Sequence, residues 1–421
     1  MIGPTTRSGA DEVMSTSRAS HEQEVVAPWA AGTQEVPVNG SAIAESAGDT
    51  GTAMAAGLES RLASPEPGRT IAQTPDEWKE TARSTGAPSL LLGPPAPRTL
   101  PLPAQRLLDA HYWMTLARAL DDRMWALNRQ GKAAFVISCC GHEAAQVGSA
   151  LALRPGIDWV LPYYRDLGVM LVLGMTAREA MLQFLARGAD PCSGGRQMPG
   201  HWSYPRLKVV TGSSPVATQL LHATGIALAS KLKREPHVTA VYFGEGSTAE
   251  GDFHEALNFA GIHRLPVVFV CENNGYAISE PQSKEMPVAN VADRASAYAM
   301  PGEVVDGNDL VAVYSAMQRA VDRARRGDGP TLLEAKTYRL VPHSSDDDDR
   351  AYRPREEVEQ WRQREPLTRF RHYLGEMGLL NDALLEETIR RVQREVDDAT
   401  EFAERAPYAP PESIFRHVYA G

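Results

Sequence analysis

Residues Gly244–Ser279 read GEGSTAEGDFHEALNFAGIHRLPVVFVCENNGYAIS, and this stretch indicates the fold. One β-rich run, Val238–Phe243, ends at the glycine-rich segment, and a second, Pro266–Cys271, ends at Asn-Asn-Gly. The sequence between the two motifs has room for one helix, predicted over Asp252–His263, and for the second strand. Because the carboxyl ends of neighbouring parallel strands meet at one edge of a sheet, both motifs are expected to face the same ligand.

The flanking sequence continues this alternation of helices and strands, with a further strand at Thr331–Thr337. The other predicted helices are Leu107–Gln130, Thr176–Arg187, Pro215–Lys233 and Leu310–Arg326, and the charged segment Arg355–Arg405 is also expected to be helical. Thr176 is expected to cap its helix, with Glu179 completing a capping box. The pattern predicts an α/β fold, a parallel sheet flanked by helices, with a helical C-terminal region.

Composition divides the chain into three regions. Residues 1–100 are rich in Ala, Gly, Ser, Thr, Pro and Glu, so we expect a disordered acidic tail that ends in a Pro-rich linker, Gly93–Pro103. Residues 101–345 are expected to form the α/β domain. Residues 346–421 are expected to form a loop and the C-terminal helical region.

Charge and composition exclude several classes of protein. The formal net charge of −10 argues against a nucleic-acid binder, and no apolar run approaches the length needed to span a bilayer. The four cysteines contain no CxxC pair, so neither a disulfide framework nor a zinc site is indicated. The N-terminus resembles neither a secretory signal nor a transit peptide, so a cytoplasmic location is expected.

The residues at the two strand ends suit a metal-bridged diphosphate. Glu245 offers a carboxylate oxygen, Asn274 an amide oxygen, and the backbone a carbonyl, all ligands that Mg²⁺ prefers. Gly244 and Gly246 let the backbone approach a bulky anion. Either motif alone more often forms a tight turn, but the two together favour a metal-diphosphate site.

The stretch Gly244–Ser279 resembles the thiamine-diphosphate motif of 2-oxoacid dehydrogenase E1 α-subunits, and the resemblance extends over roughly residues 105–418. The other segments that carry it are Tyr163–Asp166, Gly195–Pro199, Ser213–Gln219 and Tyr338–Ser344. Gly-Arg-Gln-Met-Pro and Asn-Asn-Gly-Tyr-Ala-Ile-Ser are more similar to the branched-chain (2-oxoisovalerate) members than to the pyruvate or acetoin members. The resemblance implies the thiamine-diphosphate-binding fold.

The resemblance also implies roles for individual residues. Glu245, Asn274 and the carbonyl of Tyr276 would bind Mg²⁺. His343 would be the active-site histidine, and Arg339 would help to order its loop. The implied cofactor contacts are Tyr164, Arg165, Ser214, Gly246 and Ser247, and the residues implied for a possible K⁺ site are Ser213, Pro215, Thr218 and Gln219.

Some of these roles have simpler structural alternatives. The segment 213–219 is also compatible with a helix start capped by Ser214, and Arg165 with a surface ion pair. His343 would ordinarily be an exposed loop residue. His142 and His201 have no motif that assigns them a role.

Two further positions matter for the comparison with the family. Glu272 stands where some branched-chain members carry an Arg that reaches the diphosphate. Arg165 and the metal are therefore expected to neutralise more of the charge of the anion. Ser344 matches the serine that kinases modify in mitochondrial members, in a phosphorylation-type loop. Four aspartates follow it here, and we do not expect regulation by phosphorylation.

The resemblance implies oxidative decarboxylation of branched-chain 2-oxoacids and reductive acylation of the lipoyl group of the acyltransferase E2. In two-chain members a glutamate of the β-subunit activates the cofactor, so the chain is expected to work in an α₂β₂ heterotetramer. The alternatives are a pyruvate or acetoin E1 α-subunit, a transketolase-like enzyme and a non-catalytic assembly paralogue. No GxGxxG with a downstream acid indicates a Rossmann nucleotide binder.

Overall fold

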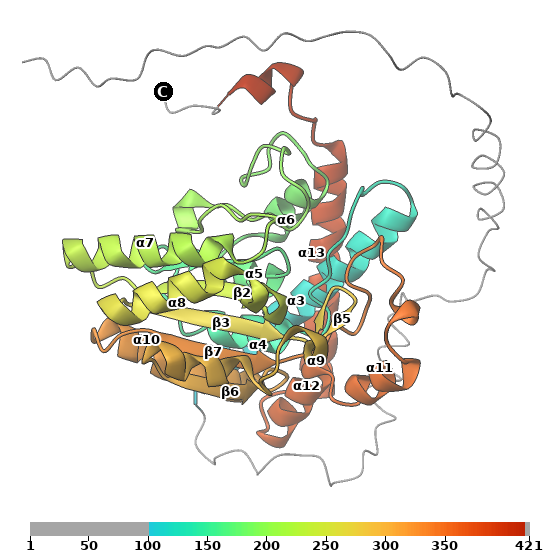
Figure 1. Ribbon diagram of the computed structural model, residues 1–421. Coiled ribbons are helices and arrows are strands. Elements are labelled where there is room, and N and C mark those ends of the chain that lie inside the picture. Colours follow the sequence, from blue (N-terminus) through green and yellow to red (C-terminus); the bar gives the residue numbers. More distant parts are fainter. Residues whose placement is uncertain (1–100, 417–421) are drawn as a thin grey trace, which may run out of the picture. The chain divides into compact units, whose positions relative to one another are not determined.

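The computed structural model describes residues 101–416, and a parallel five-stranded sheet lies at the centre of this part (Figure 1). The strand order is β1–β2–β3–β7–β6. The strands are β1 (Trp159–Leu161), β2 (Thr239–Gly244), β3 (Val267–Asn273), β6 (Gly302–Asp306) and β7 (Thr331–Lys336). The predicted strands are confirmed as β2, β3 and β7, and the short strands β1 and β6 form the edges. The fold class is therefore the predicted one.

Helices cover both faces of the sheet (Figure 1). One face packs against α7 (Thr218–Lys233) and α8 (Gly251–His263) and the other against α4 (Glu143–Ala150) and α10 (Leu310–Arg325). Side chains of β2 alternate between the two cores, with Val241 and Phe243 on the α7–α8 side and Ala240 and Tyr242 on the other. A strand buried on both faces reads as a continuous apolar run, which is the signal that predicted β2 and β3.

The remaining helices surround this centre. They are α3 (Ala104–Arg129), α5 (Leu167–Leu173), α6 (Ala177–Phe184), α9 (Gln282–Glu285), α11 (Arg355–Arg362), α12 (Pro366–Glu376) and α13 (Asp382–Arg405), with a terminal 3₁₀ turn η5 (Pro411–Phe415). The predicted C-terminal helical region is thus three helices, because Pro366 begins a new helix and Asn381 caps the next. Helix α13 packs along α3 and α6, where Arg123 donates to the Thr400 hydroxyl at 2.9 Å.

Two predicted helix starts have different outcomes. The capping box at Thr176 is confirmed, since its hydroxyl accepts from the Glu179 amide at 3.2 Å and the Glu179 carboxylate accepts from the Thr176 amide at 2.9 Å. The helix predicted from Pro215 begins at Thr218, and its N-cap residue is Ala217, with φ of 70°. Ser214 therefore does not cap this helix, and that alternative is wrong.

The predicted tail, residues 1–100, lies outside the described residues, as do residues 417–421. The boundary expected at residue 345 stays a prediction. Between residues 101 and 416, no helix combines the length and the apolar character needed to cross a membrane.

Candidate active site

A cavity of about 170 Å³ lies where four strands of the sheet end. The loops after β1, β2, β3 and β7 supply most of its wall. The lining residues are Tyr163, Tyr164, Arg165, Ser213, Val216, Gln219, Gly244, Glu245, Gly246, Ser247, Asn274, Tyr276, Ala277, Ile278, Arg339 and His343. The residues predicted from the two strand-end motifs are therefore brought together with Tyr164, Arg165 and His343, as expected for loops at one edge of a parallel sheet.

Oxygen atoms of Glu245 and Asn274 gather at one place in this cavity. Oε2 of the buried Glu245 carboxylate accepts from the backbone amide of Asn274 at 3.1 Å. The side-chain oxygen of Asn274 accepts from the backbone amide of Tyr276 at 3.2 Å. Oε1 of Glu245 is buried without a hydrogen-bond partner among the described residues. Burial raises the pKa of this carboxyl, and a cation bound beside it would favour the ionised form.

These oxygen atoms suit a hard divalent cation whose remaining ligands come from an anion. Within residues 101–416 no group of three or more His, Cys, Asp or Glu side chains is placed to hold a metal. One carboxylate with amide and carbonyl oxygens leaves positions that phosphate oxygens or water must fill. Gly246 has no space for a side chain, because a Cβ there would lie 2.7 Å from the Ala277 Cβ, so the glycine lets the two loops pack closely at the cavity.

Two buried guanidinium groups give the cavity its positive charge. Arg165 is 2% exposed and Arg339 1% exposed. Within the described part of the chain their hydrogen bonds go to carbonyl groups, to His343 and to the Tyr352 hydroxyl, with no carboxylate among these partners. Burial and the neighbouring Arg165 lower the pKa of Arg339. Two buried guanidinium groups without a hydrogen-bonded carboxylate are costly, so this arrangement favours a bound anion.

The contacts of His343 define which ring nitrogen carries the proton. Burial, followed by Arg165 and Arg339, lowers the pKa of His343 to about 3, so the ring is neutral at pH 7. Arg339 Nη1 lies 2.9 Å from Nδ1, and a guanidinium can only donate, so Nδ1 accepts and Nε2 carries the hydrogen. The ring meets Tyr164 edge-on, with centroids 6.1 Å apart.

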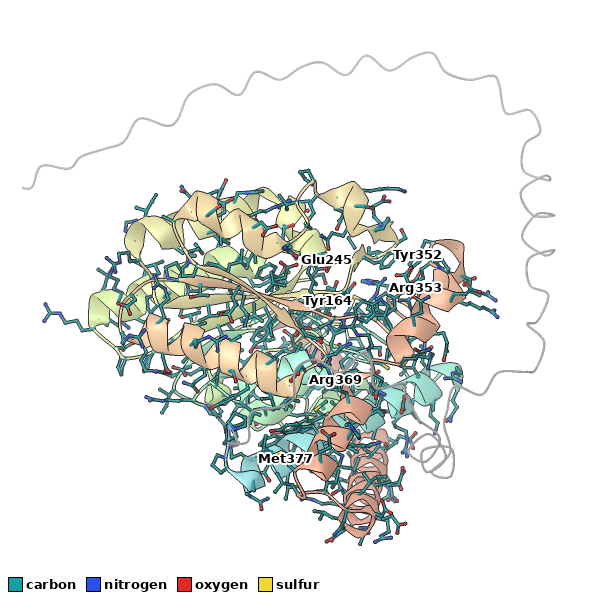
Figure 2. The ribbon with its side chains drawn as sticks, turned by 90° about the horizontal axis from the view of Figure 1, so that it is seen from below. Tyr164, Glu245, Tyr352, Arg353, Arg369 and Met377 are labelled. Carbon is teal, nitrogen blue, oxygen red and sulfur yellow. The ribbon has the colours of Figure 1, made fainter. Side chains whose placement is uncertain are left out.

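The loop that carries His343 is held by its own side chains. The His343 amide donates to Asp347 at 2.8 Å, and the Tyr352 hydroxyl donates to the same carboxylate oxygen at 2.5 Å. Arg353 donates to the Arg339 carbonyl at 2.6 Å and to the Val341 carbonyl at 2.7 Å. Figure 2 shows Tyr352 and Arg353 in this loop, with Glu245 and Tyr164 near the strand ends. Arg339 therefore helps to order the loop, as predicted, and also lines the cavity.

Glu272 is buried and does not line the cavity. Its carboxylate accepts from the Gln146 side chain at 3.2 Å and from the Tyr163 hydroxyl at 3.1 Å, and lies 2.7 Å from His142 Nδ1. Gln146 also donates to the Arg165 carbonyl at 3.1 Å. Glu272 thus supports the loop that carries Arg165, and Arg339 is the second guanidinium that lines the cavity, a position that the sequence pattern did not indicate.

The segment 213–219 is only partly placed at the cavity. Ser213 and Gln219 line it, whereas Ser214, Pro215 and Thr218 do not. The Ser214 hydroxyl lies 2.6 Å from His201 Nε2 instead. Gln219 donates to the Tyr242 carbonyl at 3.0 Å, and its buried Oε1 has no hydrogen-bond partner among residues 101–416. The K⁺ site stays a prediction, with Gln219 as the side chain that offers an oxygen.

Known proteins match this chain over the same region. The family model described as "Dehydrogenase E1 component" matches residues 111–412. The 2-oxoisovalerate dehydrogenase subunit alpha of Bacillus subtilis is 54% identical over 323 residues, which cover 77% of this chain and 98% of that protein.

Two further relatives are more distant. The 3-methyl-2-oxobutanoate dehydrogenase subunit alpha of Mycobacterium tuberculosis is 41% identical over 76% of this chain and 84% of its own length. The human mitochondrial 2-oxoisovalerate dehydrogenase subunit alpha is 39% identical over 76% of this chain and 71% of its own length. Together with the family match, these similarities confirm that the chain belongs to the family of dehydrogenase E1 components.

Proposed function

We propose that the chain is the α-subunit of the E1 component of a branched-chain 2-oxoacid dehydrogenase complex, with thiamine diphosphate and Mg²⁺ as cofactors. One observation carries the proposal: buried Arg165 and Arg339 without carboxylate partners lie in one cavity with the unpartnered oxygen of Glu245. This combination suits a diphosphate bridged by a divalent cation, because the anion neutralises the guanidinium groups and the cation the carboxylate.

The proposed Mg²⁺ ligands are Glu245, Asn274 and the carbonyl of Tyr276. The proposed diphosphate contacts are Tyr164, Arg165, Ser214, Gly246 and Ser247, to which we add Arg339. Ser214 is the weakest member of this set, since its hydroxyl already bonds His201. A K⁺ ion near Ser213, Pro215, Thr218 and Gln219 remains part of the proposal.

His343 is proposed as the catalytic residue. Thiamine diphosphate, when bound, would supply the nucleophilic carbon and accept the electron pair that remains when CO₂ leaves. Nε2–H of His343 is then the donor for the substrate oxygen that gains negative charge. Arg339 fixes the required tautomer through its bond to Nδ1. The same donor would serve acyl transfer to the lipoyl group of E2.

A partner β-subunit is part of the proposal. The cavity, about 170 Å³, is small beside the ~300–1,000 Å³ of pockets that enclose a ligand of this size. A second chain would complete the wall and provide the glutamate that the family uses to activate the cofactor. We therefore propose an α₂β₂ heterotetramer that hands its product to a lipoyl-bearing E2. A cytoplasmic location remains a prediction.

Substrate preference is tested by reconstituting the enzyme with a β-type E1 chain from the same organism. The expected result is a kcat/KM for 3-methyl-2-oxobutanoate and 4-methyl-2-oxopentanoate about 10-fold or more above that for pyruvate, because extra aliphatic carbons in a fitted pocket give discrimination of this order. A dye acceptor in place of E2 reports turnover. Preference for pyruvate or acetoin would retire the branched-chain assignment, and inactivity on every 2-oxoacid would favour the assembly paralogue.

A further inference from the structure

A short hairpin beside the metal-site residues has an unusual residue at its turn. β4 (Tyr276–Ala277) pairs with β5 (Glu280–Pro281), and Ala277 faces Glu280 across the pair. Ile278 and Ser279 therefore form a two-residue turn. Such turns favour Gly, Asn or Asp where φ is positive. Ile278 has φ of 54°, and a β-branched residue in this region is strained.

The strain at Ile278 is not offset by burial among residues 101–416. Its side chain is 57% exposed, and it lines the cavity described above. Its carbonyl accepts from Arg339 Nη2 at 2.6 Å. The other end of the same guanidinium, Nη1, lies 2.9 Å from His343 Nδ1. The turn is therefore tied to the proposed catalytic histidine through one buried side chain.

Few of the residues that line this cavity are aliphatic. Most lining residues are polar, charged or aromatic, and the aliphatic ones are Val216, Ala277 and Ile278. The Ala277 methyl group lies against Gly246. Of these three residues, Ile278 is the one whose backbone carbonyl is bridged to His343 by the Arg339 guanidinium. Because the substrate carbonyl must come within hydrogen-bond reach of His343, the carbon chain attached to it lies close to this turn.

We propose that Ile278 determines substrate specificity by contacting the aliphatic side chain of the bound 2-oxoacid. This inference rests on the proposed function. The backbone strain at this turn places an apolar side chain at the cavity. A bound apolar group that buries this side chain would offset the cost of the strain. The contact favours a branched aliphatic chain over a methyl group, and so favours 4-methyl-2-oxopentanoate over pyruvate.

The test uses the reconstituted enzyme with its β partner, with Ile278→Ala and Ile278→Gly. The glycine variant adopts the turn without strain and so keeps the fold. Both variants should lower the ratio of kcat/KM for 4-methyl-2-oxopentanoate to that for pyruvate by about 10-fold, the scale of a lost apolar contact. Ile278→Val should retain most of the ratio. Ile414, 59% exposed in η5 and away from the cavity lining, provides the matched control Ile414→Ala, which should leave the ratio unchanged.

The affinity for thiamine diphosphate and the assembly with the β partner are measured on the same variants. An unchanged ratio in Ile278→Ala and Ile278→Gly, with an active wild type, would overturn the inference alone. Weaker cofactor binding or weaker assembly at an unchanged ratio would also overturn it, by assigning the side chain to the cofactor or to the partner. A wild type inactive on both acids would instead overturn the proposed function, and this inference with it.

Discussion

Replacing His343 with alanine should lower turnover of the reconstituted enzyme by about 100-fold or more, the usual scale for a lost hydrogen-bond donor to an oxygen that develops negative charge. Binding of thiamine diphosphate should change little, since the proposed anion contacts and metal ligands remain. The physical reason is the position of the ring hydrogen: Nδ1 accepts from Arg339, so Nε2–H is free to donate a hydrogen bond to a substrate oxygen. Steady-state assay with a dye acceptor and calorimetric titration of the cofactor separate the two effects.

The matched control is His372→Ala. His372 is a helix-surface histidine whose side chain is 59% exposed and pairs with Glu376 at 3.2 Å. This variant should behave as the wild type in both measurements. Normal turnover in His343→Ala would contradict a catalytic role for His343. A large loss of cofactor affinity would mean that His343 acts in cofactor binding and not in the chemical step.

Replacing Glu245 with glutamine should lower the Mg²⁺-dependent affinity for thiamine diphosphate by about 100-fold or more, since a proposed ligand to the bridging cation loses its charge. Asn274→Ala should act in the same direction. The stability of the cofactor-free chain should not fall with Glu245→Gln, because Oε1 of Glu245 is buried without a hydrogen-bond partner among the described residues, while the glutamine keeps an oxygen that can accept from the Asn274 backbone amide. Calorimetry and thermal melting measure the two quantities on one sample.

Glu250→Gln is the control for this pair of measurements, since Glu250 lies five residues further on and is exposed. It should leave both affinity and melting temperature unchanged. If Glu245→Gln bound the cofactor as well as the wild type does, the metal site would be wrongly placed. If it melted well below the wild type in the absence of cofactor, Glu245 would be a structural residue.

The part of the fold that carries the site was predictable because its signals are local. β2 and β3 are apolar on both faces and end in Gly-Glu-Gly and Asn-Asn-Gly, so both the strands and the shared edge follow from sequence patterns. The edge strands were not predictable in the same way. β1 is apolar but only three residues long, too short for a recognisable pattern, and β6 contains no fully buried residue and so lacks a strong hydrophobic pattern.

The partners of individual side chains at the site were less predictable, because they depend on contacts distant in sequence. Arg339 reaches the Ile278 carbonyl, and Glu272 turns toward His142, although 61 and 130 residues separate these pairs. The spacing of residues within a local segment cannot predict contacts between residues so far apart in the sequence. The family resemblance placed Ser214 at the cofactor, whereas its hydroxyl bonds His201. Local patterns therefore locate the site, and tertiary contacts decide which neighbouring side chains face it.

The central claim is that this chain holds one half of a shared active site. The decisive measurement is turnover of 4-methyl-2-oxopentanoate by the purified chain alone, by its β partner alone and by the two together, with thiamine diphosphate, Mg²⁺ and a dye acceptor. Light scattering on the same samples reports whether the mixture forms an α₂β₂ assembly. The account predicts no turnover by either chain alone and full turnover by the assembled mixture. Full turnover by this chain in the absence of any partner would contradict it.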